Sequence, residues 1–405
     1  MPLGKLLTVL IGASSIAGAQ AHSGTAAVGR AAQKQIPFLF EDERIYVPVR
    51  IGTSAPRWFI LDTGASSTIL DTSVARAEHL RVEGNETIKG AGSGSSDEEQ
   101  GSSVELKLGG VPLHIMSPAV LDLAHLLGPT SGRAPAGIIG SEFFREHFVD
   151  IDFAARRIVV DPAEAARRRL YSAWVPLTFV EQTPLTHVVL KLKAGHRVEA
   201  NALVDLGAKS TFLIPEPFIA REKLRESAGP TLVTGFGAGV GGDTFYAFAR
   251  AARLSFAAAP ALGVDRPVIG LSVGGTLRST WNEGLLGAQF LSSFRIGFDY
   301  RHKRLFLGRA EVRPREFDRS GLFLVAAGDS LRRIIVRQVL KDGPGEQAGL
   351  LPEDEIIAID GESVGKAGLA GLRQMLRRPG SGILTVTYRR GADEHEAKLQ
   401  LRDLL

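Results

Sequence analysis

Residues 62–70 read Asp-Thr-Gly-Ala-Ser-Ser-Thr-Ile-Leu, and residues 205–213 read Asp-Leu-Gly-Ala-Lys-Ser-Thr-Phe-Leu. Six of the nine positions are identical, and each segment follows a short apolar stretch. Because Asp and Gly are common in ordinary turns, one such segment alone would carry little information. Two copies in one chain indicate an internal repeat.

Two more pairs of phrases support the repeat. They occur in the same order in both halves: Gly-Ile-Ile-Gly (137–140) and Phe-Val-Asp-Ile-Asp-Phe (148–153), then Gly-Leu-Leu-Gly (284–287) and Phe-Arg-Ile-Gly-Phe-Asp (294–299). Asp62 precedes Gly140 by 78 positions, and Asp205 precedes Gly287 by 82. The sequence therefore predicts two homologous lobes of about 140 residues each, a usual size for a domain.

Both lobes have the pattern of β structure. Short runs rich in β-branched and aromatic residues, such as 45–51 and 187–192, alternate with Gly-rich stretches. This pattern is typical of strands joined by turns. Helical signals are limited to short segments, which are 73–80, 121–127, 141–147, 217–226 and 288–293. The predicted fold class is mainly β.

Over residues 36–308 this arrangement resembles the pepsin-like and retropepsin-like aspartic proteases. In that family Asp-Thr-Gly-Ala after an apolar strand is the catalytic loop, and a later apolar pair followed by Gly belongs to a strand that passes behind the loop. The resemblance implies two pepsin-like β lobes. It also implies that Asp62 and Asp205 are catalytic and that Thr63, Gly64 and Gly207 support their loops.

The chemistry of such a pair explains why the pattern needs two aspartates. Two carboxylates about 3 Å apart cannot both ionise readily, so they share one proton. The ionised partner takes a proton from a water molecule, which attacks the peptide carbonyl, while the protonated partner stabilises the developing oxyanion. This mechanism needs no metal and no cofactor, and we expect none.

Leu206 departs from the family pattern. The family usually has Thr or Ser after each catalytic Asp, and their hydroxyls join the two loops; Thr63 fits, whereas Leu206 has no hydroxyl. Three outcomes remain open. The pair can work with a weaker connection, the protein can be a catalytically impaired relative that binds peptides, or lobe 1 can pair with lobe 1 of another chain.

The resemblance also implies a Gly-rich β-hairpin flap over the substrate. In lobe 1 the segment from Lys89 to Ser103 is the candidate; it includes Gly90, Gly92 and Gly94 and has an acidic tip at 97–99.

The C-terminal part resembles a bacterial PDZ domain over residues 320–402. The resemblance rests on Ala348-Gly349-Leu350, an acidic turn, and a strand followed by Asp360-Gly361. It implies a carboxylate-binding loop at Gly321, Leu322, Phe323 and Leu324, and a helix at 369–376 beside the peptide groove. C-terminal or extended peptides are the expected ligands of such a groove.

The N-terminus has the features of a secretory signal peptide. Lys5 precedes an apolar run at 6–13, and Ala19-Gln20-Ala21 follows; this run is too short to span a membrane. The predicted organisation is a signal peptide (1–21), lobe 1 (22–165), lobe 2 (166–308), a linker (309–319) and the PDZ domain (320–402). We expect a bacterial protein that is exported to the periplasm or the extracellular space, with no stable membrane insertion after cleavage.

Composition excludes several other classes of protein. The chain of 405 residues has no Cys, which excludes disulfides, thiolate metal sites and a Cys nucleophile. Its net charge is only +4, and the densest basic run, at 167–169 beside Glu164, is interpreted as a solvated surface rather than a basic stripe for nucleic acid. Ser272 lies in a G-x-S-x-G sequence, but no helical pattern follows it, as a serine-hydrolase elbow requires. The sequence therefore predicts an aspartic endopeptidase whose PDZ domain assists with protein or peptide substrates; the alternative is a non-enzymatic peptide-binding scaffold.

Overall fold

The computed structural model describes residues 34–89, 95–193, 195–229, 231–233, 237–239, 242–274, 281–309, 316–380 and 382–405. The predicted signal peptide (1–21) and residues 310–315 of the predicted linker lie outside these ranges. Within them, no helix is both long enough and apolar enough to cross a membrane.

Lobe 1 is built on a ten-stranded mixed sheet with the order β6-β7-β10-β5-β11-β4-β3-β8-β9 and with β2 beside β3. Its strands are β2 (Leu39–Glu41), β3 (Arg44–Ile51), β4 (Arg57–Leu61), β5 (Ile69–Asp71), β6 (Val82–Lys89), β7 (Ser95–Gly101), β8 (Val104–Leu108), β9 (Val111–Ile115), β10 (Ala119–Leu121) and β11 (Gly137–Ile139). In β8 and β9 the apolar side chains alternate with exposed ones and point into the lobe, because successive residues of a strand face opposite sides.

Lobe 2 repeats this plan in an eleven-stranded sheet, β19-β21-β24-β18-β25-β17-β16-β22-β23, with β15 beside β16 and β20 beside β21. Its strands are β15 (Thr178–Val180), β16 (Thr183–Lys191), β17 (Arg197–Asp205), β18 (Phe212–Ile214), β19 (Leu232–Val233), β20 (Gly237–Gly239), β21 (Gly242–Arg250), β22 (Arg253–Phe256), β23 (Gly263–Asp265), β24 (Val268–Gly274) and β25 (Gly284–Gly287). The run β7-β10-β5-β11-β4-β3-β8-β9 corresponds strand for strand to β21-β24-β18-β25-β17-β16-β22-β23. The repeated phrases in the sequence thus correspond to a repeated topology.

A third sheet joins the two lobes. It has the order β1-β13-β12-β26-β27-β14, in which β12 of lobe 1 pairs with β26 of lobe 2. Its strands are β1 (Lys34–Pro37), β12 (Val149–Asp152), β13 (Arg157–Val160), β14 (Ala173–Pro176), β26 (Phe294–Asp299) and β27 (Arg304–Arg309). One apolar core runs through all three sheets and includes Phe144 and Phe298, whose rings meet edge to face.

The lobes contain short helices: α1 (Thr72–Ala77), α2 (Leu123–Ser131), α3 (Ser141–Glu146), α4 (Glu164–Leu170), α5 (Glu216–Arg221), α6 (Leu224–Ser227) and α7 (Ala288–Leu291). The five predicted helical segments are found, with one difference. The segment 217–226 is two helices, because Lys223 adopts a left-handed conformation (φ 50°) between them. Helix α4, between the lobes, was not predicted.

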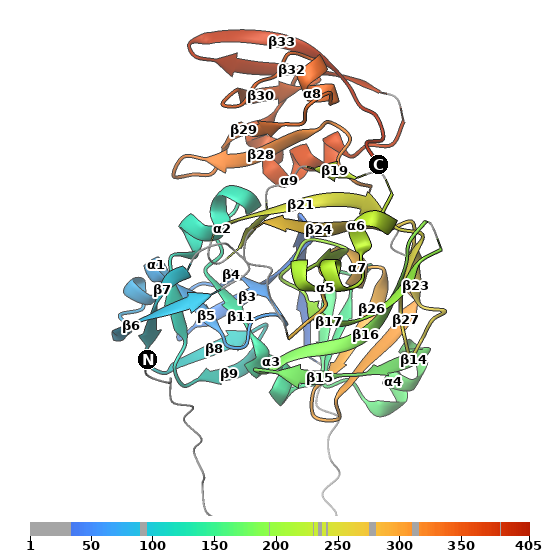
Figure 1. Ribbon diagram of the computed structural model, residues 1–405. Coiled ribbons are helices and arrows are strands. Elements are labelled where there is room, and N and C mark those ends of the chain that lie inside the picture. The colour runs from blue at the N-terminus through green and yellow to red at the C-terminus, as the bar shows by residue number, and fades with distance from the viewer. Residues whose placement is uncertain are drawn as a thin grey trace, which may run out of the picture. The chain divides into compact units, whose positions relative to one another are not determined.

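The C-terminal domain has its own sheet and core. Strands β28 (Leu322–Ala327), β29 (Arg333–Val339), β30 (Glu355–Ile359), β32 (Ile383–Arg390) and β33 (Asp393–Gln400) follow one another in the sheet, and β31 (Glu362–Ser363) pairs with β30. Helices α8 (Pro344–Gln347) and α9 (Val364–Leu376) complete the domain. As Figure 1 shows, this domain lies beside α2, and β28 contacts that helix.

Candidate active site

The Asp62 loop begins at the end of β4. The Asp62 N–H donates to the Ile139 carbonyl at 3.0 Å, which places β11 directly behind the loop. The Gly64 N–H donates to Asp62 Oδ1 at 2.7 Å. An Asp carboxylate that accepts a hydrogen bond from the backbone N–H two residues later in the chain commonly stabilises a tight turn.

The Asp205 loop has the same construction in lobe 2. Strand β25 runs parallel to β17, with Gly287 opposite Asp205. The N–H groups of Gly207 and Ala208 donate to Asp205 Oδ1 at 2.8 and 3.0 Å.

The two loops meet at their carboxyl groups. The Gly207 N–H donates to Oδ1 of both aspartates, at 2.8 Å for Asp205 and 3.2 Å for Asp62, so the two carboxyl groups are adjacent. A Cβ atom on Gly64 would lie 2.6 Å from Asp205 Cγ, and one on Gly207 would lie 2.2 Å from Asp62 Oδ2. Because any side chain at either position would displace a carboxyl group, only glycine permits this approach.

The connection between the loops is one-sided. Thr63 Oγ1 donates to the Val204 carbonyl at 2.7 Å and accepts from the Leu206 N–H at 3.1 Å. Thr63 and Leu206 are both fully buried. The leucine side chain has no hydroxyl with which to return the bonds, so only lobe 1 contributes a hydroxyl to the contact between the loops.

The electrostatics of the pair favour a shared proton. Burial raises the pKa of Asp62, although backbone donors partly oppose the effect. Burial also raises the pKa of Asp205 well above its ordinary value, and the neighbouring charge of Asp62 adds to this rise. Burial is the main cause that raises the pKa of Tyr300 well above its ordinary value. The negative charge of the nearby Asp62 and Asp205 raises it further. The buried hydroxyl of Tyr300 has no hydrogen-bond partner among the described residues.

Comparison with known families agrees with this geometry. Residues 47–143 match the family model described as aspartyl protease, and residues 335–390 match that of the PDZ domain. The chain contains an aspartyl protease domain and a PDZ domain. The aspartyl protease match is of the retropepsin-like type and includes Asp62, whereas Asp205 lies outside it. No curated protein matches the chain.

The flap candidate is described only in part. Strands β6 and β7 of the protease domain form an antiparallel hairpin, with Val82 opposite Gly101. Gly90, Gly92 and Gly94 lie outside the described residues. The acidic tip predicted at 97–99 is wrong, because these residues belong to strand β7, which pairs with β6.

In the PDZ domain, hydrogen bonds within the chain already use N–H groups of the predicted carboxylate-binding loop. The Asp318 carboxylate accepts hydrogen bonds from the N–H groups of Ser320 (2.9 Å) and Gly321 (2.8 Å). The Leu322 N–H donates to the Ser320 hydroxyl at 3.0 Å. Phe323 and Leu324 lie in the edge strand β28, where a β-bulge separates them. Two backbone donors that a peptide carboxylate would use therefore already have acceptors.

Sequence reasoning missed two cations beside the Asp205 loop. Arg44 Nε donates to the Gly207 carbonyl at 3.3 Å, and the ammonium group of Lys209 forms an ion pair with Asp42. Lys209 could have been noticed, because it replaces Ser66 at one of only three positions that differ between the repeated segments. Nothing in the repeat points to Arg44.

Two observations concern other kinds of site. The described residues contain no group of three or more His, Asp or Glu side chains that could hold a metal ion. Ser272 is buried in the middle of strand β24, whereas a serine-hydrolase nucleophile sits on a strand-to-helix turn.

Proposed function

We propose that the protein is an aspartic endopeptidase in which Asp62 and Asp205 activate water. The observation that carries the proposal is that two carboxyl groups from the repeated loops lie together and share the Gly207 N–H as a donor; burial raises the pKa of both. The aspartyl protease match around Asp62 supports the same reaction class.

The proposed mechanism uses one proton held by the pair. The ionised carboxylate takes a proton from water, whose oxygen attacks the peptide carbonyl, and the protonated carboxyl group donates to the developing oxyanion. A proton then passes to the leaving amine. The backbone donors of both loops bind the Oδ1 atoms, which leaves the Oδ2 atoms for water and substrate. Because such a pair titrates as a unit, neither Asp is assigned a fixed role.

Activity measurements on Asp62→Asn and Asp205→Asn test the proposal. With a denatured protein as substrate, each change should lower turnover by about 10²–10⁴-fold, the usual contribution of a general acid or base. Asp265→Asn is the matched control, since this exposed aspartate pairs with Arg253 in lobe 2. Equal activity of all three variants and the wild type would refute the proposal.

Two other results would replace it with a specific alternative. An effect of Asp62→Asn alone, with activity that rises steeply with protein concentration, would mean that lobe 1 pairs with lobe 1 of another chain. A wild-type protein without peptidase activity would be a peptide-binding scaffold, and the observation that favours this second function is the one-sided connection at Leu206.

We further propose that the PDZ domain binds extended segments of protein substrates. Because Asp318 already occupies the amides of Ser320 and Gly321, a strand added along β28 is favoured over capture of a C-terminal carboxylate. A labelled peptide should bind the full chain equally well with a free or an amidated C-terminus. A strong loss of affinity on amidation would contradict this mode.

We also propose that the protein is exported to the periplasm or the extracellular space, on the basis of the signal-like N-terminus. The mature chain should begin near His22 when N-terminal sequencing is done on exported protein. An intact Met1 would contradict cleavage.

A further inference from the structure

The hairpin turn between β2 and β3 is unusual because both of its residues are acidic and buried. Glu41 pairs with Arg44, so Asp42 and Glu43 form the two-residue loop. Both have left-handed backbones, with φ of 47° and 59°, a conformation that glutamate in particular seldom adopts. Their side chains are only 4% and 3% exposed. Buried carboxylates require partners, and this turn has three cations around it.

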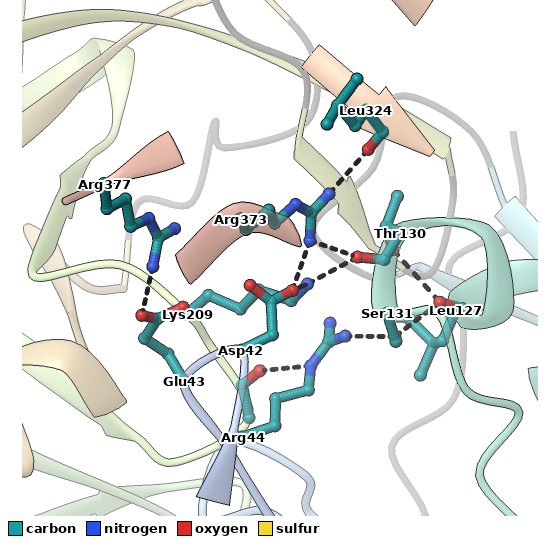
Figure 2. Close-up of polar contacts among 11 residues, drawn as sticks. Asp42, Glu43, Arg44, Leu127, Thr130, Ser131, Lys209, Leu324, Arg373 and Arg377 are labelled. Carbon is teal, nitrogen blue, oxygen red and sulfur yellow. Dashed lines mark hydrogen bonds and ion pairs between the residues drawn. The ribbon is translucent and has the colours of Figure 1, made fainter. Parts of the chain in front are cut away.

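Asp42 and Glu43 form ion pairs with two other parts of the chain (Figure 2). Asp42 Oδ2 contacts Lys209, in the Asp205 loop of lobe 2, and also Arg373, in helix α9 of the PDZ domain. Glu43 Oε1 lies 2.6 Å from Nη1 of Arg377, the C-cap residue of the same helix. Burial raises the pKa of Asp42, but the charges of Lys209, Arg373 and Arg377 outweigh it and hold the pKa well below its ordinary value.

The same turn also holds the loop that carries Asp205. Arg44 donates from Nε to the Gly207 carbonyl at 3.3 Å and from Nη1 to the Ser131 hydroxyl at 2.6 Å. Lys209 Nζ donates to the Thr130 carbonyl at 2.7 Å. These contacts attach the lobe 2 loop to lobe 1 at two points, immediately after the position where Leu206 offers no hydroxyl.

The end of helix α2 is the second anchor of the network. Thr130 and Ser131 belong to the last turn of α2, whose carbonyl groups lack partners within the helix and favour cations. Arg373 Nη1 shares the Thr130 carbonyl with Lys209, at 2.8 Å. A methyl group at Gly132 would lie 2.8 Å from Leu369 Cβ, which shows how closely α9 packs against this end of α2.

We propose that Arg44 and Lys209 are positioning residues for the Asp62–Asp205 pair, and that helix α9 of the PDZ domain completes their support by holding Asp42. In this arrangement the PDZ domain is part of the structure that fixes the Asp205 loop, in addition to any peptide that it binds. The kinetic consequences rest on the proposed peptidase function. The effect on the mobility of the loop does not.

The double variant Arg373→Gln/Arg377→Gln in the full chain tests the inference. Amide hydrogen exchange of residues 205–211 should become faster, since local opening is governed by local contacts. On a short peptide substrate kcat should fall by about 5- to 150-fold, the usual range for coupling between sites, with KM nearly unchanged and the pH dependence of kcat displaced. A loss of packing alone would not displace the pH profile.

Two further variants keep the test decisive. Asp42→Asn removes the charge but retains a residue that tolerates a left-handed turn, so it should fold and reproduce the effects of the double variant. Arg333→Gln is the matched control, because Arg333 pairs with Glu355 inside the PDZ domain. Its exchange and kinetics should equal those of the wild type.

The possible results separate the two proposals. Unchanged exchange at residues 205–211 in both the double variant and Asp42→Asn would overturn the inference, whatever the kinetics. If the variants exchange faster than the wild type but the wild type has no peptidase activity, the proposed function is refuted and the link between α9 and the loop is supported. Faster exchange with unchanged kcat and pH profile would overturn the positioning role.

Discussion

Replacing Thr63 with Val should weaken the hydrogen bonding between the two lobes. Valine has nearly the same shape as threonine but no hydroxyl, so the packing around the side chain should not change. The Thr63 hydroxyl makes two buried hydrogen bonds, to the Val204 carbonyl and from the Leu206 N–H. Each buried hydrogen bond contributes about 1 kcal/mol, and leaving a buried N–H without an acceptor costs about 1–3 kcal/mol. We therefore expect Thr63→Val to lower the free energy of unfolding of the lobes by about 2–4 kcal/mol.

Tryptophan fluorescence can measure this loss in the lobes alone. The chain has three tryptophans, Trp58, Trp174 and Trp281, and all lie in the lobes. The midpoint of thermal unfolding should fall by about 2–4 °C for each kcal/mol lost, as in domains of comparable size. Peptidase activity should fall with it, because the hydroxyl aligns the two aspartate loops.

Thr63→Ser is the control for this measurement. Serine keeps the hydroxyl and removes one buried methyl group, which costs about 1 kcal/mol. If Val and Ser lowered the midpoint equally, or if Val left activity unchanged, the hydroxyl of Thr63 would not be the connection between the loops and the reasoning would be wrong.

Two other predictions concern the charge of the pair and the PDZ groove. Folding raises the pKa of Asp205 above its ordinary value of 3.8, so the stability this group contributes is present below that pH and is lost as the pH rises through the raised value. Asp205→Asn should therefore stabilise the lobes at pH 7, by about 1.4 kcal/mol for each pKa unit by which folding raises this group, and should have little effect at pH 3. Thermal unfolding at the two pH values measures this, and an equal change at both would contradict it. Arg373 Nη2 donates to the Leu324 carbonyl at 2.8 Å and so occupies the edge of β28 to which a peptide strand would add. Arg373→Gln should raise the affinity of the full chain for an extended peptide by about 10- to 150-fold, since a hydrogen bond to a charged group is worth about 1.5–3 kcal/mol. An unchanged affinity in fluorescence anisotropy titrations would show that Arg373 does not block the groove.

The elements predicted correctly are those whose signal is local in the sequence. Strand β3 follows from the β-rich run at 45–51 and α3 from the segment 141–147, both close to their observed bounds. Helix α4 was missed because its Arg-rich segment was interpreted as a solvated surface. That surface does exist on the helix, where the side chain of Arg168 is 79% exposed beside Glu164. The division at Lys223 was missed because a single left-handed residue leaves no mark on apolar periodicity.

The sequence by itself determined that two aspartate loops exist, that each follows a strand, and that a PDZ domain comes after them, because such motifs depend on residues close together in the chain. Only the tertiary structure decided which groups meet. The Thr63 hydroxyl bonds a residue 143 positions away, Arg44 one 163 away, and Arg373 bonds Asp42 across 331 positions. No periodicity or spacing encodes these pairs, since their geometry appears only when the lobes and the PDZ domain pack together.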